Sequence, residues 1–149
     1  MTKKEIIIKI HLAKAAHMRW RNIAQISIGG LSNEVSKVSL PILQTESEFG
    51  KWYYGDGMAL SMLSSYMGIE EPLENVFNTY IQIFTLMRSK KKSSGLFGWG
   101  DVAKKKAEMD GLVVNFGNHN KVLLDSIHQL ELEVMNLSDS DFSQLINLD

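Results

Sequence analysis

The sequence predicts an all-α protein, a four-helix bundle with additional short helices. Proline occurs only at Pro41 and Pro72 in 149 residues, so long segments can be helical without interruption. Apolar residues recur at spacings of three and four, the period of an α-helix, along several long segments. No segment of useful length alternates apolar and polar residues as a half-buried strand does.

Composition narrows the class of protein further. With 149 residues and a 44% hydrophobic share, residues 1–149 are expected to form a single domain with one core. The net charge of −1 favours neither a nucleic-acid binder nor a disordered acidic tail. The absence of cysteine excludes disulfides, Cys-ligated metals and thiol nucleophiles. No apolar run approaches a membrane span and the start lacks a secretory signal, so we expect a cytoplasmic protein.

The first predicted helix runs from Thr2 to about Ile28 and ends at Gly29 and Gly30. Seven residues at spacings of four and three form one face of it: Ile6, Ile10, Ala13, His17, Trp20, Ala24 and Ser27. A second helix is expected within residues 32–57. Its boundaries stay open because Pro41 and the glycine-flanked aromatic residues 49–55 interrupt the pattern.

The second half of the chain contains two more long helices. A short helix over 58–66 precedes a helix that Pro72 opens and that continues to about Met87. Residues 88–106, which we call the basic loop, carry seven Lys and Arg against one Asp and are predicted to be a loop or insertion within the domain. The last long helix runs from about Asp101 to Met135. The cluster 138–141 then supplies the N-cap of a short terminal helix.

Three local motifs occur in order along the chain. They are His17-Met18-Arg19-Trp20, Phe49-Gly50-Lys51-Trp52-Tyr53-Tyr54-Gly55 and Glu71-Pro72-Leu73-Glu74-Asn75-Val76-Phe77. Together they resemble the chemoreceptor zinc-binding (CZB) domain of bacterial signalling proteins, over roughly residues 5–135. That resemblance implies a helical bundle, commonly a symmetric dimer, with a sensory or regulatory role. In the family, three histidines and one cysteine hold a zinc ion.

Only one of those four ligands is present here. His17 stands at the first ligand position, whereas Ser47, Leu73 and Phe77 stand at the other three; we call these four the vestigial ligand positions. Serine is a poor zinc ligand, and Leu and Phe offer no lone pair. We therefore expect no zinc and no other cofactor, with Leu73 and Phe77 filling the space. His17 is expected to be a core histidine bonded to a backbone carbonyl or a carboxylate. The alternative is a remnant ligand in a pocket that holds another metal or a small molecule.

The functional hypotheses concern binding, because no nucleophile elbow, phosphate loop, HExxH or paired-carboxylate motif occurs. The first is a non-catalytic, metal-independent sensory, regulatory or adaptor module of bacterial signalling, including chemotaxis, that forms a homodimer and contacts another protein in trans. Candidate interaction residues are Trp52, Tyr53, Tyr54, Lys90, Lys91, Lys92, Phe97 and Trp99. For the three aromatic residues 52–54, the alternative is a packing role. For the whole protein, the alternative is peripheral binding of a membrane or nucleic acid through the basic loop, for which the sequence gives no firm evidence.

Overall fold

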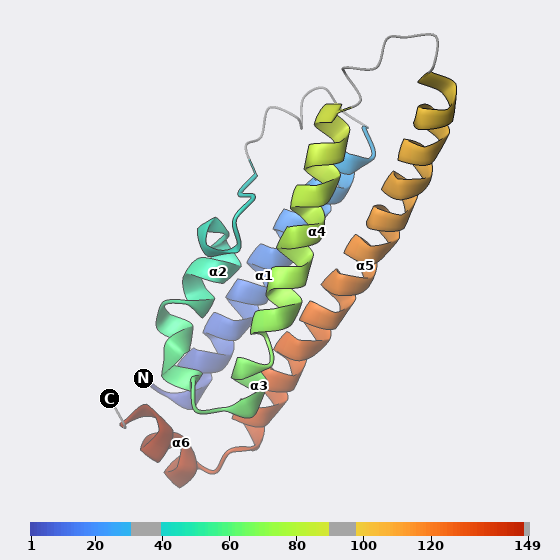
Figure 1. Ribbon diagram of the computed structural model, residues 1–149. Helices are drawn as coiled ribbons and strands as arrows, with labels where there is room; N and C mark the ends of the chain where they lie inside the picture. Colours follow the sequence, from blue (N-terminus) through green and yellow to red (C-terminus); the bar gives the residue numbers. More distant parts are fainter. Residues whose placement is uncertain (31–39, 90–97, 148–149) are drawn as a thin grey trace.

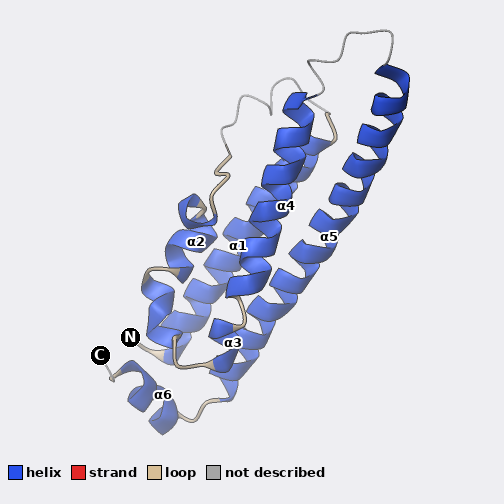
Figure 2. Cartoon of the chain, in the orientation of Figure 1, coloured by secondary structure: helices blue, strands red, loops and turns tan. Residues whose placement is uncertain are grey.

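The computed structural model describes residues 1–30, 40–89 and 98–147, and within these ranges all regular structure is helical, with no strand (Figure 2). Three long helices run side by side along the molecule: α1 (Lys3–Ile28), α4 (Glu70–Ser89) and α5 (Gly98–Asn136) (Figure 1). Short helices cover a further side: η2 (Gln44–Glu46), α2 (Glu48–Tyr53), η3 (Asp56–Leu60) and α3 (Ser64–Met67). A last helix, α6 (Asp139–Ile146), lies at one end and contacts η3. The predicted all-α class is confirmed.

Helix α1 begins and ends where the sequence predicts. The Thr2 hydroxyl accepts a hydrogen bond from the Glu5 N–H, and the Glu5 carboxylate accepts one from the Thr2 N–H, which is a capping box. At the other end, Gly29 forms the C-cap and Gly30 adopts a φ of 66°, which favours glycine. The helix therefore has a defined start and stop.

The second helix, predicted within residues 32–57, is present in the described part as the short helices η2 and α2 rather than as one long helix. The short helix predicted over 58–66 is divided between η3 and α3. Ser47 caps α2 by accepting a hydrogen bond from the Gly50 N–H at 2.9 Å. A Cβ at Gly50 would lie only 1.7 Å from the Gln44 carbonyl oxygen, so the chain can fold back on itself there only with glycine. The close turns give this side of the bundle an irregular surface beside α1.

The predicted boundaries of the basic loop are wrong at both ends. Helix α4 continues to Ser89, and α5 begins at Gly98, so residues 88–89 and 98–106 are helical. Between Val102 and Asn115 no side chain is fully buried, so this part of α5 lacks the apolar periodicity by which a helix is recognised. Lysine is nevertheless a good helix former on an exposed surface. Residues 90–97 lie outside the described part of the chain.

The core is built around Trp20 of α1. Its indole ring stacks on Phe77 at 4.4 Å between ring centroids and meets Tyr80 edge-on at 5.1 Å. Phe116 of α5 lies 6.0 Å away. The indole N–H donates to the Pro41 carbonyl at 3.0 Å, which satisfies the one polar atom of this side chain. Three long helices thus meet at one aromatic cluster.

Candidate functional site

The vestigial ligand positions begin with His17, which is 1% exposed and faces the core as predicted. Its ring Nε2 lies 2.9 Å from Oδ1 of Asn120. The Asn120 amide nitrogen donates to the Phe116 carbonyl at 2.7 Å, so Oδ1 accepts from His17 and Nε2 carries the proton. The prediction that His17 bonds to a backbone carbonyl or a carboxylate is wrong, because its partner is the side-chain amide of Asn120 on α5.

Burial sets the charge state of His17. It lowers the pKa of the imidazole to about 4, more than the bond to Asn120 raises it. The other ring nitrogen, Nδ1, is buried and has no hydrogen-bond partner among the described residues. His17 is therefore a neutral side chain at pH 7, packed 5.7 Å from the Trp20 ring and 5.9 Å from the Phe49 ring.

The other three vestigial ligand positions have structural roles. The Ser47 hydroxyl donates to the Gln44 carbonyl at 2.8 Å while it caps α2. Leu73 and Phe77 are fully buried in the core, as the sequence predicts. The residues present do not fit a zinc ion, because they offer one imidazole nitrogen, one hydroxyl used in capping and two hydrocarbon side chains. Nowhere in the described residues do three or more His, Asp or Glu side chains come together as a metal site would require.

Tyr53 does not belong to an interaction surface, which corrects one of the predicted contact residues. Tyr53 is 3% exposed, and its hydroxyl donates to the Tyr66 carbonyl at 3.2 Å. The Tyr66 hydroxyl in turn donates to the Tyr53 carbonyl at 2.5 Å. The half-buried Tyr54 donates to Glu70 at 2.7 Å and accepts from Gln44 at 2.6 Å. Burial raises the pKa of both Tyr53 and Tyr54. The packing alternative holds for Tyr53, and the contact role of Tyr54 stays a prediction.

Trp52 is the predicted contact residue that lies at a hollow on the surface. The hollow, of about 310 Å³, lies between α1 and α2. Its lining residues are Lys9, Leu12, Ala13, Ala16, Arg19, Glu48, Trp52 and Asp56. The half-buried Trp52 ring lies against Gly57, where a Cβ would come within 3.3 Å of the indole. The lining of the hollow thus combines small apolar residues, one indole and four charged side chains.

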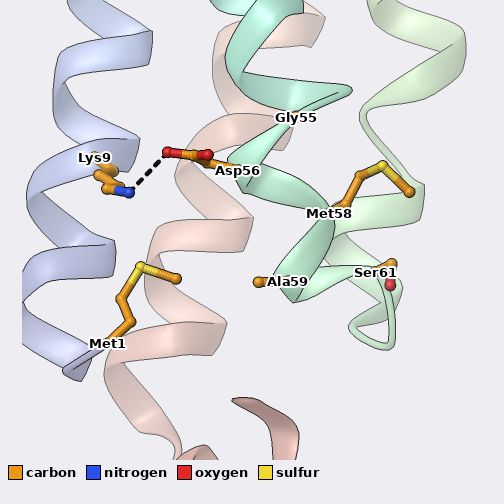
Figure 3. A pocket seen from close by; sticks show the side chains of 7 residues that line it. All are labelled: Met1, Lys9, Gly55, Asp56, Met58, Ala59 and Ser61. Atoms are coloured by element: carbon orange, nitrogen blue, oxygen red, sulfur yellow. Dashed lines mark hydrogen bonds and ion pairs between the residues drawn. The ribbon is translucent and has the colours of Figure 1, made fainter. Parts of the chain in front are cut away.

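A second hollow, of about 420 Å³, lies further toward the N-terminus. Its lining residues are Met1, Lys9, Gly55, Asp56, Met58, Ala59 and Ser61. Figure 3 shows Lys9 reaching from α1 toward Asp56, and the two side chains form an ion pair of 2.8 Å. Both hollows share this pair. We call the two hollows together the α1–α2 groove.

Next to the groove, α1 carries a row of exposed residues that the sequence analysis did not single out. We call this row the α1 outer face: Ile8, Leu12, Ala15, Arg19, Asn22 and Ile26. The residues follow one another at spacings of four, three, four, three and four, so they lie on one side of the helix. Leu12 is 65% exposed, Ile8 48% and Ile26 40%. The spacing was readable in the sequence and would have revealed this second row.

The charges on α1 are almost all positive. The helix contains six Lys and Arg residues against the single Glu5. Lys9 pairs with Asp56, and Lys14 lies 3.9 Å from Glu131 of α5. Lys4 and Arg19 are exposed and form no ion pair within the described residues. The α1 outer face therefore combines three large apolar side chains, Ile8, Leu12 and Ile26, with one positive charge, Arg19.

The remaining predicted contact residues cannot be combined with this site. Lys90, Lys91, Lys92 and Phe97 lie outside the described residues, and Trp99 lies in the first turn of α5, where side chains are not described.

Comparisons with protein-family models, with curated proteins and with solved structures found no match to this chain. Among the described helices, none has both the length and the apolar character needed to cross a membrane.

Proposed function

We propose that this protein is a non-catalytic regulatory or adaptor module that binds another protein through the α1 outer face and the α1–α2 groove. The observation that carries this proposal is the exposed row of α1, with the large apolar side chains Ile8, Leu12 and Ile26, beside a hollow lined by Trp52. Exposed large apolar side chains next to a concave site with charged lining residues are typical of protein contact sites. Leu12 and Arg19 belong to both the row and the hollow, which makes them one surface.

The composition of this surface supports a protein partner. Tryptophan and arginine are the side chains that contribute most often to binding energy at protein interfaces, and both line the hollow. The acidic residues that line the hollow are engaged with lysines: Asp56 with Lys9 at 2.8 Å and Glu48 with Lys51 at 2.9 Å. The lining thus combines charged and apolar side chains, as expected of a contact surface.

The resemblance to CZB domains extends the proposal to a setting. It supports a role in bacterial signalling such as chemotaxis, in the cytoplasm, with a protein partner in trans and without a metal. The homodimer that the resemblance implies stays a prediction, which the sedimentation of the purified protein tests. The alternative use of the basic loop on a membrane or nucleic acid also stays a prediction, since residues 90–97 lie outside the described part.

Site-specific crosslinking in the source cells tests the proposed function. A photoreactive amino acid at Ala15, in the middle of the α1 outer face, is expected to form a covalent product with another protein. The same amino acid at Val122, an exposed position on α5, serves as the matched control. The product at position 15 should disappear when Leu12→Asp is added. Equal products at both positions, or none at either, would contradict the proposal.

A further inference from the structure

The α1 outer face also indicates what kind of partner it binds, an inference that rests on the proposed function. We infer that its occupant is an acidic amphipathic α-helix of a partner protein. The spacing of the row, the volume and lining of the hollow beside it and the charges on α1 each support this occupant.

The spacing of the row favours a helix. Alternating steps of four and three from Ile8 to Ile26 are the a and d positions of a heptad repeat, and all six residues are exposed. At a rise of about 1.5 Å per residue, the row is about 27 Å long, enough for some five turns of a partner helix. A narrow row with two residues in each heptad is typical of the contact between two paired helices. A helix that enters a membrane surface instead presents a broad apolar face with large side chains. Here Ala15, Arg19 and Asn22 interrupt the large side chains.

The hollow beside the row accepts one large side chain from that helix. The small residues Ala13 and Ala16 and the indole of Trp52 line it. Ala15 in the outer row lets a second helix approach α1 closely at the same level. In heptad pairing, side chains of one helix enter holes between four residues of the other. The 310 Å³ hollow between Leu12 and Arg19 provides such a hole.

The charges on α1 favour a partner helix with negatively charged side chains. Lys4 and Arg19 lie on or beside the row without an ion pair in the described residues, and after Glu5 no acidic residue follows on α1. A second copy that docked through its own α1 would bring the same positive charges together, which is unfavourable. Carboxylates that flank the apolar seam of a partner helix would instead pair with Arg19 and Lys4.

A pair of designed peptides tests this inference on the purified full chain. The acidic probe is a three-heptad helix with Leu at a and d and Glu at e and g, and the basic probe has Lys at e and g. Fluorescence anisotropy is expected to show binding of the acidic probe at least about tenfold tighter than of the basic probe. Added salt should weaken the acidic probe's binding. Arg19→Glu should reduce the difference between the probes, and Leu12→Asp should abolish binding. Val122→Asp, on α5, should change neither.

The possible results separate this inference from the proposed function. If both probes bind equally or neither binds, the acidic helix is overturned, and a crosslink at Ala15 in cells would still support the proposed function. If the wild-type protein binds vesicles of phosphatidylserine and phosphatidylcholine and neither peptide, the occupant is a membrane and the inference fails. If the protein is a dimer that Leu12→Asp dissociates and no peptide binds, the occupant is a second copy and the inference also fails. Circular dichroism confirms that each variant is folded.

Discussion

The two faces of α1 share one sequence pattern and have opposite environments. The inner face consists of Ile6, Ile10, Ala13, His17, Trp20 and Ala24, and all six side chains are buried. The outer face repeats the same alternation of four and three, from Ile8 to Ile26, and all six of its residues are exposed. Periodicity therefore locates the faces of a helix, but it does not show whether the same chain covers them. The described residues cover the inner face with α4 and α5 and leave the outer face exposed.

The largest expected effect comes from breaking the inner face at its centre. Trp20→Ala should lower the free energy of unfolding by about 3–5 kcal/mol, because the indole contacts Phe77, Tyr80 and Phe116 and the cavity it leaves cannot fully collapse. Urea unfolding followed by circular dichroism measures this loss. A loss below about 1 kcal/mol would show that the aromatic cluster does not hold the three long helices together.

The second effect is the acid sensitivity of the inner face. The folded-state pKa of His17 is about 4, below the ordinary value of 6.5, so between these values the unfolded chain binds a proton that the folded chain does not. The contribution of neutral His17 to the free energy of unfolding is therefore fully present above about pH 6.5 and is lost as the pH falls toward 4. The expected loss over this window is up to about 3 kcal/mol.

A comparison with His17→Gln isolates this contribution. Glutamine can donate to Asn120 Oδ1 but does not titrate, and the variant retains Glu5, Glu48 and Glu131, whose own pKa values are lowered by their hydrogen bonds. Urea unfolding between pH 7 and pH 4 should therefore give a flatter profile for the variant than for the wild type. Parallel profiles would mean that His17 is accessible to protons in the folded state.

The smallest expected effect on stability comes from the outer face of α1, which is compared with a buried position on the inner face. Leu12→Ala should change the free energy of unfolding by no more than about 0.5 kcal/mol, since the side chain is 65% exposed. Ile10→Ala, two residues away on the inner face and fully buried, should cost about 2–5 kcal/mol. Unfolding in urea at low protein concentration measures both. Equal losses would mean that the outer face is already covered in the free protein.

Strong local signals predicted the fold where they existed. The capping residues Thr2 and Ser138 and the glycines after Ile28 mark helix ends correctly, because each acts on backbone groups a few residues away. The last long helix was predicted to start at about Asp101, three residues after the observed start at Gly98. The basic loop was wrongly extended to residue 106 because the first turns of α5, from Val102 to Asn115, have no fully buried side chain and so no apolar period.

The candidate site depended more on tertiary structure. Trp52 was identified as a contact residue from its local sequence, but its hollow is completed by Leu12 and Ala16 from a different helix. The bond between His17 and Asn120 joins residues 103 positions apart, and no local rule predicts such a partner. Tyr53 has the same glycine-flanked neighbourhood as Trp52 and is buried, because Tyr66 of α3 receives its hydroxyl. Local chemistry names candidate residues, and packing decides which of them face solvent.

The two reciprocal bonds between Tyr53 and Tyr66 have a dynamic consequence for the groove. They close a ring of chain between residues 13 positions apart, in a region with only short helices. Opening this segment requires both bonds to break together, so the amide protons between residues 53 and 66 should exchange with solvent as one cooperative unit rather than one by one. Asp56 lies within this segment and the Trp52 indole lies against its Gly57. We therefore expect this side of the groove to keep its shape before any partner arrives, so that a partner loses less conformational entropy on binding to it.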